Sequence, residues 1–318
     1  MRFARVWTAL FTGPLLVIAS TAMAGGSGNT FNVHCGASSG LNSIGAALKA
    51  LQYAEESHSP STINVSGVCN ENVLIQNLDR LTLNAAPGAS INDVSGGNQD
   101  TVQVANSNSV TINNFTINGG ASGVSCVLGS LCFVNGITAQ GAGFGGVTAG
   151  ALSRVFVSGG TLQDNYYGLE VVNGGGAWAF GVSIRHNNAG GVELSRQAVL
   201  NTDATITGNT GSGVFAHENA TLSCNGCSVT GNTILGVILR RNSTARFAGA
   251  VITGNTGGGV LLSEESSAFF QGSQNNVTGN PGGRDVTCGA SATTAKFATT
   301  NIGGGSTNCS EPVDPPYP

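Results

Sequence analysis

The sequence predicts an all-β solenoid, because one short sequence motif recurs in it at a nearly fixed period. Between residues 160 and 280, each copy runs from an apolar strand through an asparagine into a Gly-rich turn and an aliphatic strand. The anchoring asparagines are 22, 22, 23, 23 and 25 residues apart; they are Asn165, Asn187, Asn209, Asn232, Asn255 and Asn280. A period of this size is typical of repeat proteins, in which each repeat packs against its neighbours.

Composition and length agree with stacked strands and tight turns. Gly numbers 49, and charged residues make up only 9% of the 318-residue chain. A solenoid grows by adding coils, so this length does not require separate cores and we expect one repeat domain. Less regular copies of the motif occur around Asn118 and Gln140, so we expect the first coils to begin well before residue 160.

Residues 1–24 have the features of a secretory signal peptide. A basic start precedes an apolar centre at residues 10–19, and small residues at 22–24 predict cleavage near Ala24. We therefore expect a secreted or periplasmic protein. No later apolar run is long enough to span a bilayer, so we expect no membrane insertion.

The charge balance argues against a nucleic-acid partner. The formal net charge is −4, and removing Arg2 and Arg5 with the signal peptide leaves 10 basic and 16 acidic residues, or −6. Proteins that bind nucleic acid present a basic patch, which this composition does not provide.

All eight cysteines follow the signal peptide, and an even number in an exported chain favours disulfides. Local pairing predicts Cys35 with Cys69, Cys126 with Cys132, Cys224 with Cys227, and Cys288 with Cys309, while other connectivities stay open. The Cys-Asn-Gly-Cys sequence at 224–227 is alternatively a redox or metal motif. It has no second ligand pair and no helix behind it, so we expect neither a metal nor a cofactor.

One amphipathic helix is expected at residues 43–56. Apolar residues at offsets 0, 3, 4 and 7 from Ile44 form one face, and Asn42 or Ser43 can cap the first turn. We place this helix in an N-terminal segment, 25–62, where it covers the open end of the first coil. The repeat domain is expected at 63–302, followed by a Pro-rich tail at 303–318.

Two stretches resemble the start of proteins of the pectin lyase-like superfamily. Ala46-Ala47-Leu48 matches their "AAL"-type helix, and residues 67–73, which end in Glu-Asn-Val, match their "G-T-x-x-E-N-V" strand. The resemblance covers nearly the whole chain after the signal peptide. It implies an all-β, single-stranded right-handed parallel β-helix of about nine coils with an N-terminal amphipathic capping helix. It implies no single reaction, because the superfamily contains lyases, hydrolases, epimerases and members without known catalysis.

The fixed period predicts which side chains are neighbours on the surface. Equivalent residues of successive coils lie above one another, about 4.8 Å apart. In the strand after each asparagine, the flanking aliphatic residues should face the core and the residue between them should face outward. These outward residues are Glu170, Glu193, Phe215, Ile238 and Leu261.

The two stacked glutamates are a candidate site. Like charges this close raise at least one pKa and so can create a general acid, and a separation of about 5 Å is typical of the carboxylates of retaining glycosidases. The alternative interpretation is that Glu170 and Glu193 are solvated surface groups held by Arg185 or Arg196.

Other polar residues of the same two coils enlarge this candidate site. Asp164, Arg185 and His186 precede the repeated asparagine, where the next three coils have only Thr-Gly. A polysaccharide lyase needs a group that neutralises a uronate carboxylate and a base for the proton alpha to it; Arg185 with His186 or a tyrosine could serve. The candidate catalytic residues are therefore Glu170, Glu193, His186, Arg185 and Asp164, and the candidate substrate-binding residues are Tyr166, Tyr167 and Phe215. The alternative is that these residues only begin the exposed face of the repeats.

Three other sets of residues are interpreted as structural. The column of Arg196, Glu218, Arg241 and Glu264 alternates in sign, which helps to fix register although each exposed pair contributes little. The repeated asparagines are expected to hydrogen-bond along the stack and to the turn backbone. His217 and Arg240 are interpreted as surface residues.

The predicted function is binding without catalysis. Short turns and few titratable groups favour a protein that binds, or presents a surface to, extracellular or periplasmic polysaccharide. The alternative is a carbohydrate-active enzyme, an acidic-polysaccharide lyase or a glycoside hydrolase, that uses the cluster from Asp164 to Glu193. The chain lacks the paired aspartates of polygalacturonase-like relatives, the acid-rich calcium site of pectate lyases and the Asp-Pro-His signature of alginate epimerases, so those three chemistries are not expected.

Overall fold

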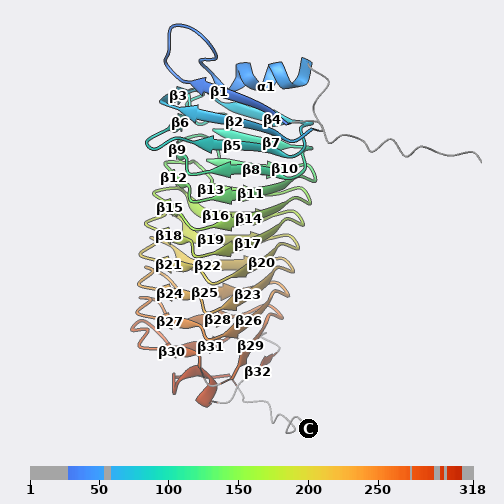
Figure 1. The fold of residues 1–318 in the computed structure, drawn as a ribbon. Helices are drawn as coiled ribbons and strands as arrows, with labels where there is room; N and C mark the ends of the chain where they lie inside the picture. The colour runs from blue at the N-terminus through green and yellow to red at the C-terminus, as the bar shows by residue number, and fades with distance from the viewer. Residues whose placement is uncertain (1–27, 54–58, 273, 290–293, 297–298, 310–318) are drawn as a thin grey trace, which may run out of the picture.

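Three parallel sheets wrap around one core and form a long β-helix (Figure 1). The computed structural model describes residues 28–53, 59–272, 274–289, 294–296 and 299–309. The predicted signal peptide and the end of the predicted tail, residues 310–318, lie outside these ranges. In the part of the chain that the structure describes, no helix is long and apolar enough to cross a membrane.

Each sheet is built from strands that recur once per coil. Sheet A consists of β1 (Asn29–His34), β2 (Ser61–Ser66), β5 (Leu81–Ala85), β8 (Val110–Asn113), β11 (Leu131–Asn135), β14 (Arg154–Ser158), β17 (Gly176–Phe180), β20 (Val199–Thr202), β23 (Thr221–Asn225), β26 (Thr244–Ala248), β29 (Ser267–Gln271) and β32 (Thr294–Lys296). Sheet B consists of β3 (Val68–Asn70), β6 (Ser90–Asn92), β9 (Thr116–Asn118), β12 (Thr138–Gln140), β15 (Thr161–Gln163), β18 (Ser183–Arg185), β21 (Thr205–Thr207), β24 (Ser228–Thr230), β27 (Val251–Thr253) and β30 (Asn276–Thr278). Sheet C consists of β4 (Val73–Gln76), β7 (Val102–Ala105), β10 (Val124–Val127), β13 (Gly145–Ala149), β16 (Tyr167–Val172), β19 (Gly190–Ser195), β22 (Ser212–His217), β25 (Val237–Leu239), β28 (Val260–Leu262) and β31 (Val286–Cys288).

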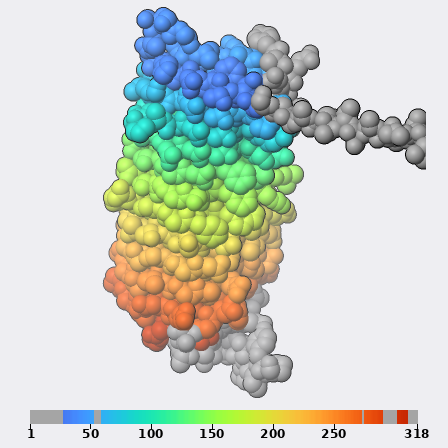
Figure 2. Space-filling view, in the orientation of Figure 1, coloured from blue at the N-terminus to red at the C-terminus, as the bar shows by residue number. Residues whose placement is uncertain are grey.

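The chain passes through sheets B, C and A in turn, and about ten such coils form a right-handed solenoid, close to the nine expected. Each strand pairs with the equivalent strands of the coils before and after it. The colour therefore changes steadily along the molecular surface from one end to the other (Figure 2). Residues 22 or 23 positions apart are thus neighbours from β8 to β29 of sheet A, whereas partners in the first strands of that sheet are 20 to 32 positions apart.

The core is a narrow column of aliphatic side chains, as the alternation predicts. The residues that flank each outward position of sheet C, such as Leu169 and Val171 around Glu170, are fully buried. Phe247 and Phe270 fill the core near the C-terminal end, where their rings stack with centroids 4.9 Å apart.

The repeated asparagines form a buried ladder at the turn from sheet B to sheet C, which confirms their structural role. Asn187 is typical: its Nδ2 donates to the carbonyl oxygen of Leu162 at 3.1 Å and to Oδ1 of Asn209 at 2.9 Å, and its backbone N–H donates to the same Oδ1. Asp285 ends the ladder, because its Oδ1 accepts from both nitrogens of Asn280. Partial burial acts to raise the pKa of Asp285, but these hydrogen bonds and those from Ser306 hold it below its ordinary value.

The turn from sheet C to sheet A carries the predicted ladder of alternating charge. Glu218 lies 3.5 Å from Nε of Arg196 and 2.8 Å from Nη1 of Arg241, and Arg241 lies 3.4 Å from Glu264. These residues have positive φ, between 50° and 59°. The side chains are largely exposed, so the pairs help to align coils while each contributes only about 0 to 1 kcal/mol.

The four predicted disulfides are all present. Cys35 bonds to Cys69, Cys126 to Cys132, Cys224 to Cys227 and Cys288 to Cys309. The pair at 224–227 is therefore oxidised, and its thiols are not available as metal ligands.

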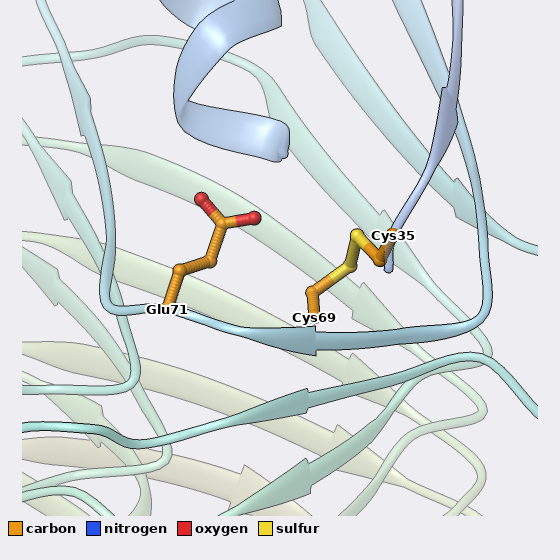
Figure 3. A group of neighbouring side chains, drawn as sticks. All are labelled: Cys35, Cys69 and Glu71. Carbon is orange, nitrogen blue, oxygen red and sulfur yellow. A yellow bond between two sulfur atoms is a disulfide. The ribbon is translucent and has the colours of Figure 1, made fainter. Parts of the chain in front are cut away.

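The predicted helix is present as α1 (Ile44–Tyr53) at the N-terminal end of the solenoid (Figure 1). Oγ of Ser43 accepts from the backbone N–H of Ala46 at 3.2 Å, which confirms the predicted cap. Glu71, next to the disulfide of the first coil (Figure 3), accepts from the N–H groups of Ile44 and Gly45 at 2.7 and 2.9 Å. A carboxylate is favourable there because it satisfies free N–H groups at the positive end of the helix dipole.

Both ends of the solenoid differ from the expected domain boundaries. The segment assigned to 25–62 contains β1, which pairs with β2 and so belongs to sheet A. At the other end, η1 (Thr299–Ile302) leads into residues 303–309, which pack on the last coil instead of beginning a tail. Ser306 donates to Asp285 through its N–H and its hydroxyl, and Val286 forms a parallel bridge with Thr307.

Asn209→Ala tests the contribution of the buried ladder. The substitution leaves the N–H of Asn187 and the carbonyl of Ile184 without their partners. A buried unsatisfied group costs about 1–3 kcal/mol, so the free energy of unfolding should fall by about 3 kcal/mol or more. Urea unfolding measures this loss. Asn225→Ala, at an exposed amide in β23 that donates to Asn201, is the control and should cost less than about 1 kcal/mol. Equal losses would contradict the assigned role of the ladder.

Candidate functional site

The outer face of sheet C carries a column of residues that changes from polar to apolar along the molecule. The register pairs Thr148 with Glu170, Glu170 with Glu193, and Glu193 with Phe215. The column continues through Ile238 and Leu261. The sequence predicted this order, and the structure adds the residues on either side of it.

Glu193 is the most buried carboxyl group on this face. Its side chain points outward from the sheet, between the inward-facing Val192 and Leu194, yet the residue is only 8% exposed. Oε1 lies 2.6 Å from Nε2 of His217, while Oε2 is buried and has no hydrogen-bond partner among the described residues. Burial raises the pKa of Glu193; the hydrogen bond and charge of His217 and a hydrogen bond with the Tyr167 side chain oppose this rise, and the charge of Glu170 adds to it.

Glu170, on the adjacent strand, is joined to a short chain of hydroxyl groups. Oε2 of Glu170 accepts from Oγ1 of Thr148 at 3.1 Å, and the same Oγ1 lies 3.1 Å from Oγ of Ser122. Burial raises the pKa of Glu170 against the effect of the Thr148 hydrogen bond, and the nearby charge of Asp100 raises it further.

Tyr167 borders the two carboxyl groups on one side. Its ring has room because Gly190 is its partner in the register: a Cβ at Gly190 would lie only 3.3 Å from Cε1 of the tyrosine. The ring meets that of Tyr166 edge-on, with centroids 5.0 Å apart. Burial, together with the charge of Glu193 and a hydrogen bond to its carboxyl group, raises the pKa of the Tyr167 hydroxyl above its ordinary value.

Phe215, His217 and Arg240 border the carboxyl groups on the other side. The rings of Phe215 and His217 stack with centroids 4.6 Å apart, and the guanidinium of Arg240 lies 5.9 Å from the centre of the Phe215 ring. Tyr167, Phe215 and Arg240 line a shallow depression of about 230 Å³. We call the set of Tyr167, Glu170, Glu193, Phe215, His217 and Arg240 the sheet C cluster.

The structure brings together only part of the cluster that the sequence predicted. Arg185 lies on sheet B, where it donates to Oε1 of Gln163 at 2.9 Å and ends a ladder of amide side chains. Asp164 and His186 are exposed residues of the turn from sheet B to sheet C, both with positive φ. Tyr166 is 48% exposed at the margin. The alternative interpretation, in which Arg185 or Arg196 holds the glutamates, does not fit the structure, because Arg185 contacts Gln163 and Arg196 pairs with Glu218.

His217 and Arg240, which the sequence interpretation treated as surface residues, belong to the cluster. Ser195 is the direct register partner of His217, so Glu193 is its diagonal neighbour, within reach of a long side chain. The same repeat alignment that found Glu193 could have found His217 if diagonal pairs had been considered.

Sheet A carries an aromatic stack that the sequence interpretation missed. Phe133, Phe156 and Trp178 are half-buried, with centroids 5.2 and 4.7 Å apart and nearly parallel rings. They are 23 and 22 residues apart in the sequence, so the repeat period could have predicted that these three rings stack. Because each ring covers the next, the stack presents mainly ring edges to solvent.

One group of possible metal ligands occurs within the described ranges. The ligand atoms of Cys35, Cys69 and Glu71 lie within 4.8 Å of one another (Figure 3). Two of them form a disulfide and the third caps α1, so this group is structural. The carboxyl groups of the sheet C cluster do not form such a group with His217.

The sheet C cluster has the components of acid–base chemistry and of sugar binding. Two neighbouring carboxyl groups with raised pKa values can hold or transfer a proton, and an imidazole contacts one of them. The flanking aromatic rings offer apolar surface beside these polar groups.

Comparisons with known proteins agree on the fold. The family model described as "Right handed beta helix region" matches residues 145–300. Pectate lyase Pel9A aligns with a TM-score of 0.52 at 12% identity, over 85% of this chain and 79% of that chain. The A-module of mannuronan C-5 epimerase AlgE4 from Azotobacter vinelandii aligns with a TM-score of 0.51 at 12% identity, over 80% of this chain and 88% of that chain. No curated protein sequence matches the chain significantly.

Glu170→Gln tests the burial of the carboxyl pair through the pH dependence of stability. The folded pKa of Glu170 lies above its ordinary value of 4.5, so its stabilising contribution is fully present below about that pH and is lost as the pH rises through the folded pKa. The wild type should therefore lose free energy of unfolding relative to the variant as the pH rises, by about 1.4 kcal/mol for each unit of pKa difference. Urea unfolding at a series of pH values measures this. A pH-independent difference for Glu170→Gln would contradict the assigned burial.

Proposed function

We propose that this right-handed parallel β-helix protein, which has the pectin lyase-like fold, binds polysaccharide along the outer face of sheet C. The observation that carries the proposal is the depression of about 230 Å³ that Tyr167 and Phe215 line together with Arg240, on the face that also carries Glu170 and Glu193.

Sugars fit this combination of groups. A pyranose ring has apolar C–H faces, which pack on aromatic rings, and a polar rim, which needs hydrogen-bond partners. Tyr167 and Phe215 supply the first kind of contact, and Glu193, Glu170 and Thr148 supply the second. The regular spacing of the strands, about 4.8 Å, suits a polymer that runs along the solenoid axis.

Other observations support an extracytoplasmic setting. Four disulfides are typical of proteins that fold in an oxidising compartment. The predicted signal peptide agrees with export. Both similar structures are named for activities on acidic polysaccharides, pectate and mannuronan, which supports a glycan ligand without identifying it.

Catalysis is a second candidate function, and one observation favours it. Glu170 and Glu193 are register partners with raised pKa values, and His217 contacts the second of them. A protonated carboxyl beside an ionised one is the arrangement of general acid and nucleophile or base in glycosidases. Binding stands first because the depressions on this face are open ones, of about 430 Å³ beside Leu74 and Gln103 and about 230 Å³ beside Tyr167 and Phe215, and the second does not include either glutamate.

Binding assays with Phe215→Ala and Tyr167→Ala test the proposed surface. Each variant should bind the best glycan of a panel of uronate, neutral and amino polysaccharides about tenfold more weakly than the wild type, because aromatic contacts carry much of such binding. Phe180→Ala, which removes a 39% exposed ring from sheet A, is the matched control and should keep wild-type affinity. Weaker binding by the control alone would place the ligand on sheet A and refute the proposal.

Turnover is followed in the same incubations through reducing ends and the absorbance of unsaturated products. The binding function predicts no product with any member of the panel. Product formation that Glu193→Gln abolishes would establish the enzyme instead.

A further inference from the structure

We infer that a cleft near the N-terminal end of sheet C binds neutral, hydroxyl-rich sugar units of the same glycan, so that the ligand extends along the sheet from this cleft to Tyr167 and Phe215. The inference rests on the proposed function, because it adds a second subsite to the ligand surface proposed there. Its basis is the juxtaposition of a cavity lined by amide side chains, a loop held by internal hydrogen bonds, and a row of hydroxyl groups that leads toward the glutamates.

The cleft has a volume of about 430 Å³ and lies over β4 and β7. Its apolar surface includes Leu74, a half-exposed residue whose register partner is Gln103. Its polar surface comes from five amide and carboxyl side chains, those of Asn72, Asn98, Gln99, Asp100 and Gln103. Apolar surface beside several converging polar groups is typical of sites for small ligands. We call this site the amide cleft.

The loop from β6 to β7 supplies three of these polar residues and is fixed by its own hydrogen bonds. It has nine residues, 93–101, whereas the equivalent turn from β15 to β16 has three. The carboxylate of Asp93 accepts from the N–H groups of Ser95 and Gly97 at 2.8 and 2.7 Å. Oγ of Ser95 accepts in turn from the N–H of Gln99 at 2.9 Å. A loop that is ordered before binding loses less entropy when the ligand arrives.

Polar atoms of the amide cleft are open to a ligand. Gln99 is exposed, and its side chain forms no hydrogen bond with the residues that the structure describes. Gln103 is half-buried and uses only Nε2, which donates to Oδ2 of Asp100 at 3.1 Å. Each amide therefore offers a carbonyl oxygen, and Gln99 also offers its N–H groups. Sugar hydroxyls donate and accept hydrogen bonds, so they match both kinds of atom.

The charge of the amide cleft favours a neutral sugar. Asp100 is the one charged residue that lines it, and all of its lining residues lie in the described ranges. The charge of Asp100 also reaches Glu170, whose pKa it raises. A uronate placed here would meet like charges, which is unfavourable. The arginine of this face, Arg240, lines the other depression instead.

A row of small hydroxyl residues connects the amide cleft with the glutamates. Ser125 and Thr148 follow Gln103 in the outward column of sheet C and precede Glu170. Both are recessed, with exposed fractions of 3% and 8%. Five register steps lead from Gln103 to Phe215, or about 24 Å at the strand spacing. One extended sugar chain can therefore occupy the cleft and the depression together.

The test measures binding of the full chain after export to oligosaccharides of increasing length by titration calorimetry. The neutral probes are glucose oligomers from cellulose and mannose oligomers from mannan, and the charged probe is a galacturonate series from pectate. We expect the affinity for at least one neutral series to rise about tenfold once the chain reaches about 24 Å, because the second subsite is then filled within one molecule. The galacturonate series should show no such rise.

Gln103→Ala and Gln99→Ala should each remove most of this rise and leave the affinity for short oligomers within about twofold. The Gln99 side chain has no internal hydrogen bond, so its removal should also leave urea unfolding unchanged. Gln52→Ala, which removes an exposed glutamine from α1, is the matched control and should keep the full length dependence.

The contrary outcomes separate this inference from the proposed function. A neutral series whose affinity does not change with length, or a rise that both cleft variants keep, would overturn the second subsite while glycan binding stands. An equal rise for galacturonate would overturn the assignment of a neutral sugar. Binding of none of these oligomers, nor of any polysaccharide in the wider panel, would refute the proposed function itself.

Discussion

The parallel register between successive coils is the constraint on which the rest of this structure depends. The buried asparagine ladder holds that register at one corner, since each rung accepts from the backbone and the side chain of the rung before it. Burying these amides is tolerable only because nearly every polar atom finds a partner in the next coil. A one-residue slip would expose the aliphatic core and separate every column on the surface, including the glutamate pair.

Residues that the period controls could be predicted from the sequence. Glu170, Glu193 and Phe215 occupy the expected outward column, and the charged ladder and all four disulfides are as expected. The period does not give the angle between sheets, so Arg185 was placed beside Glu193 although it points outward from a different sheet. Diagonal contacts depend on side-chain rotamers, and for this reason the Glu193–His217 contact required the structure.

The cluster differs from the scaffold around it in how its polar atoms are satisfied. On sheet B and along the charged ladder, side chains pair with equivalents in the next coil and are complete without a ligand. At Glu193 the next residue in its column is Phe215, which offers no donor, and the contact with the next coil is made instead by the diagonal neighbour His217, 2.6 Å away. The change from acid to aromatic in one column therefore places a half-buried ring directly beside a buried carboxyl group.

A crystal structure with a bound oligosaccharide tests the central claim, that the outer face of sheet C is the ligand surface, most directly. The account predicts a sugar packed against Tyr167 and Phe215, in the depression that they line with Arg240. A sugar bound instead on the Phe133–Phe156–Trp178 stack of sheet A, with the sheet C cluster empty, would contradict it.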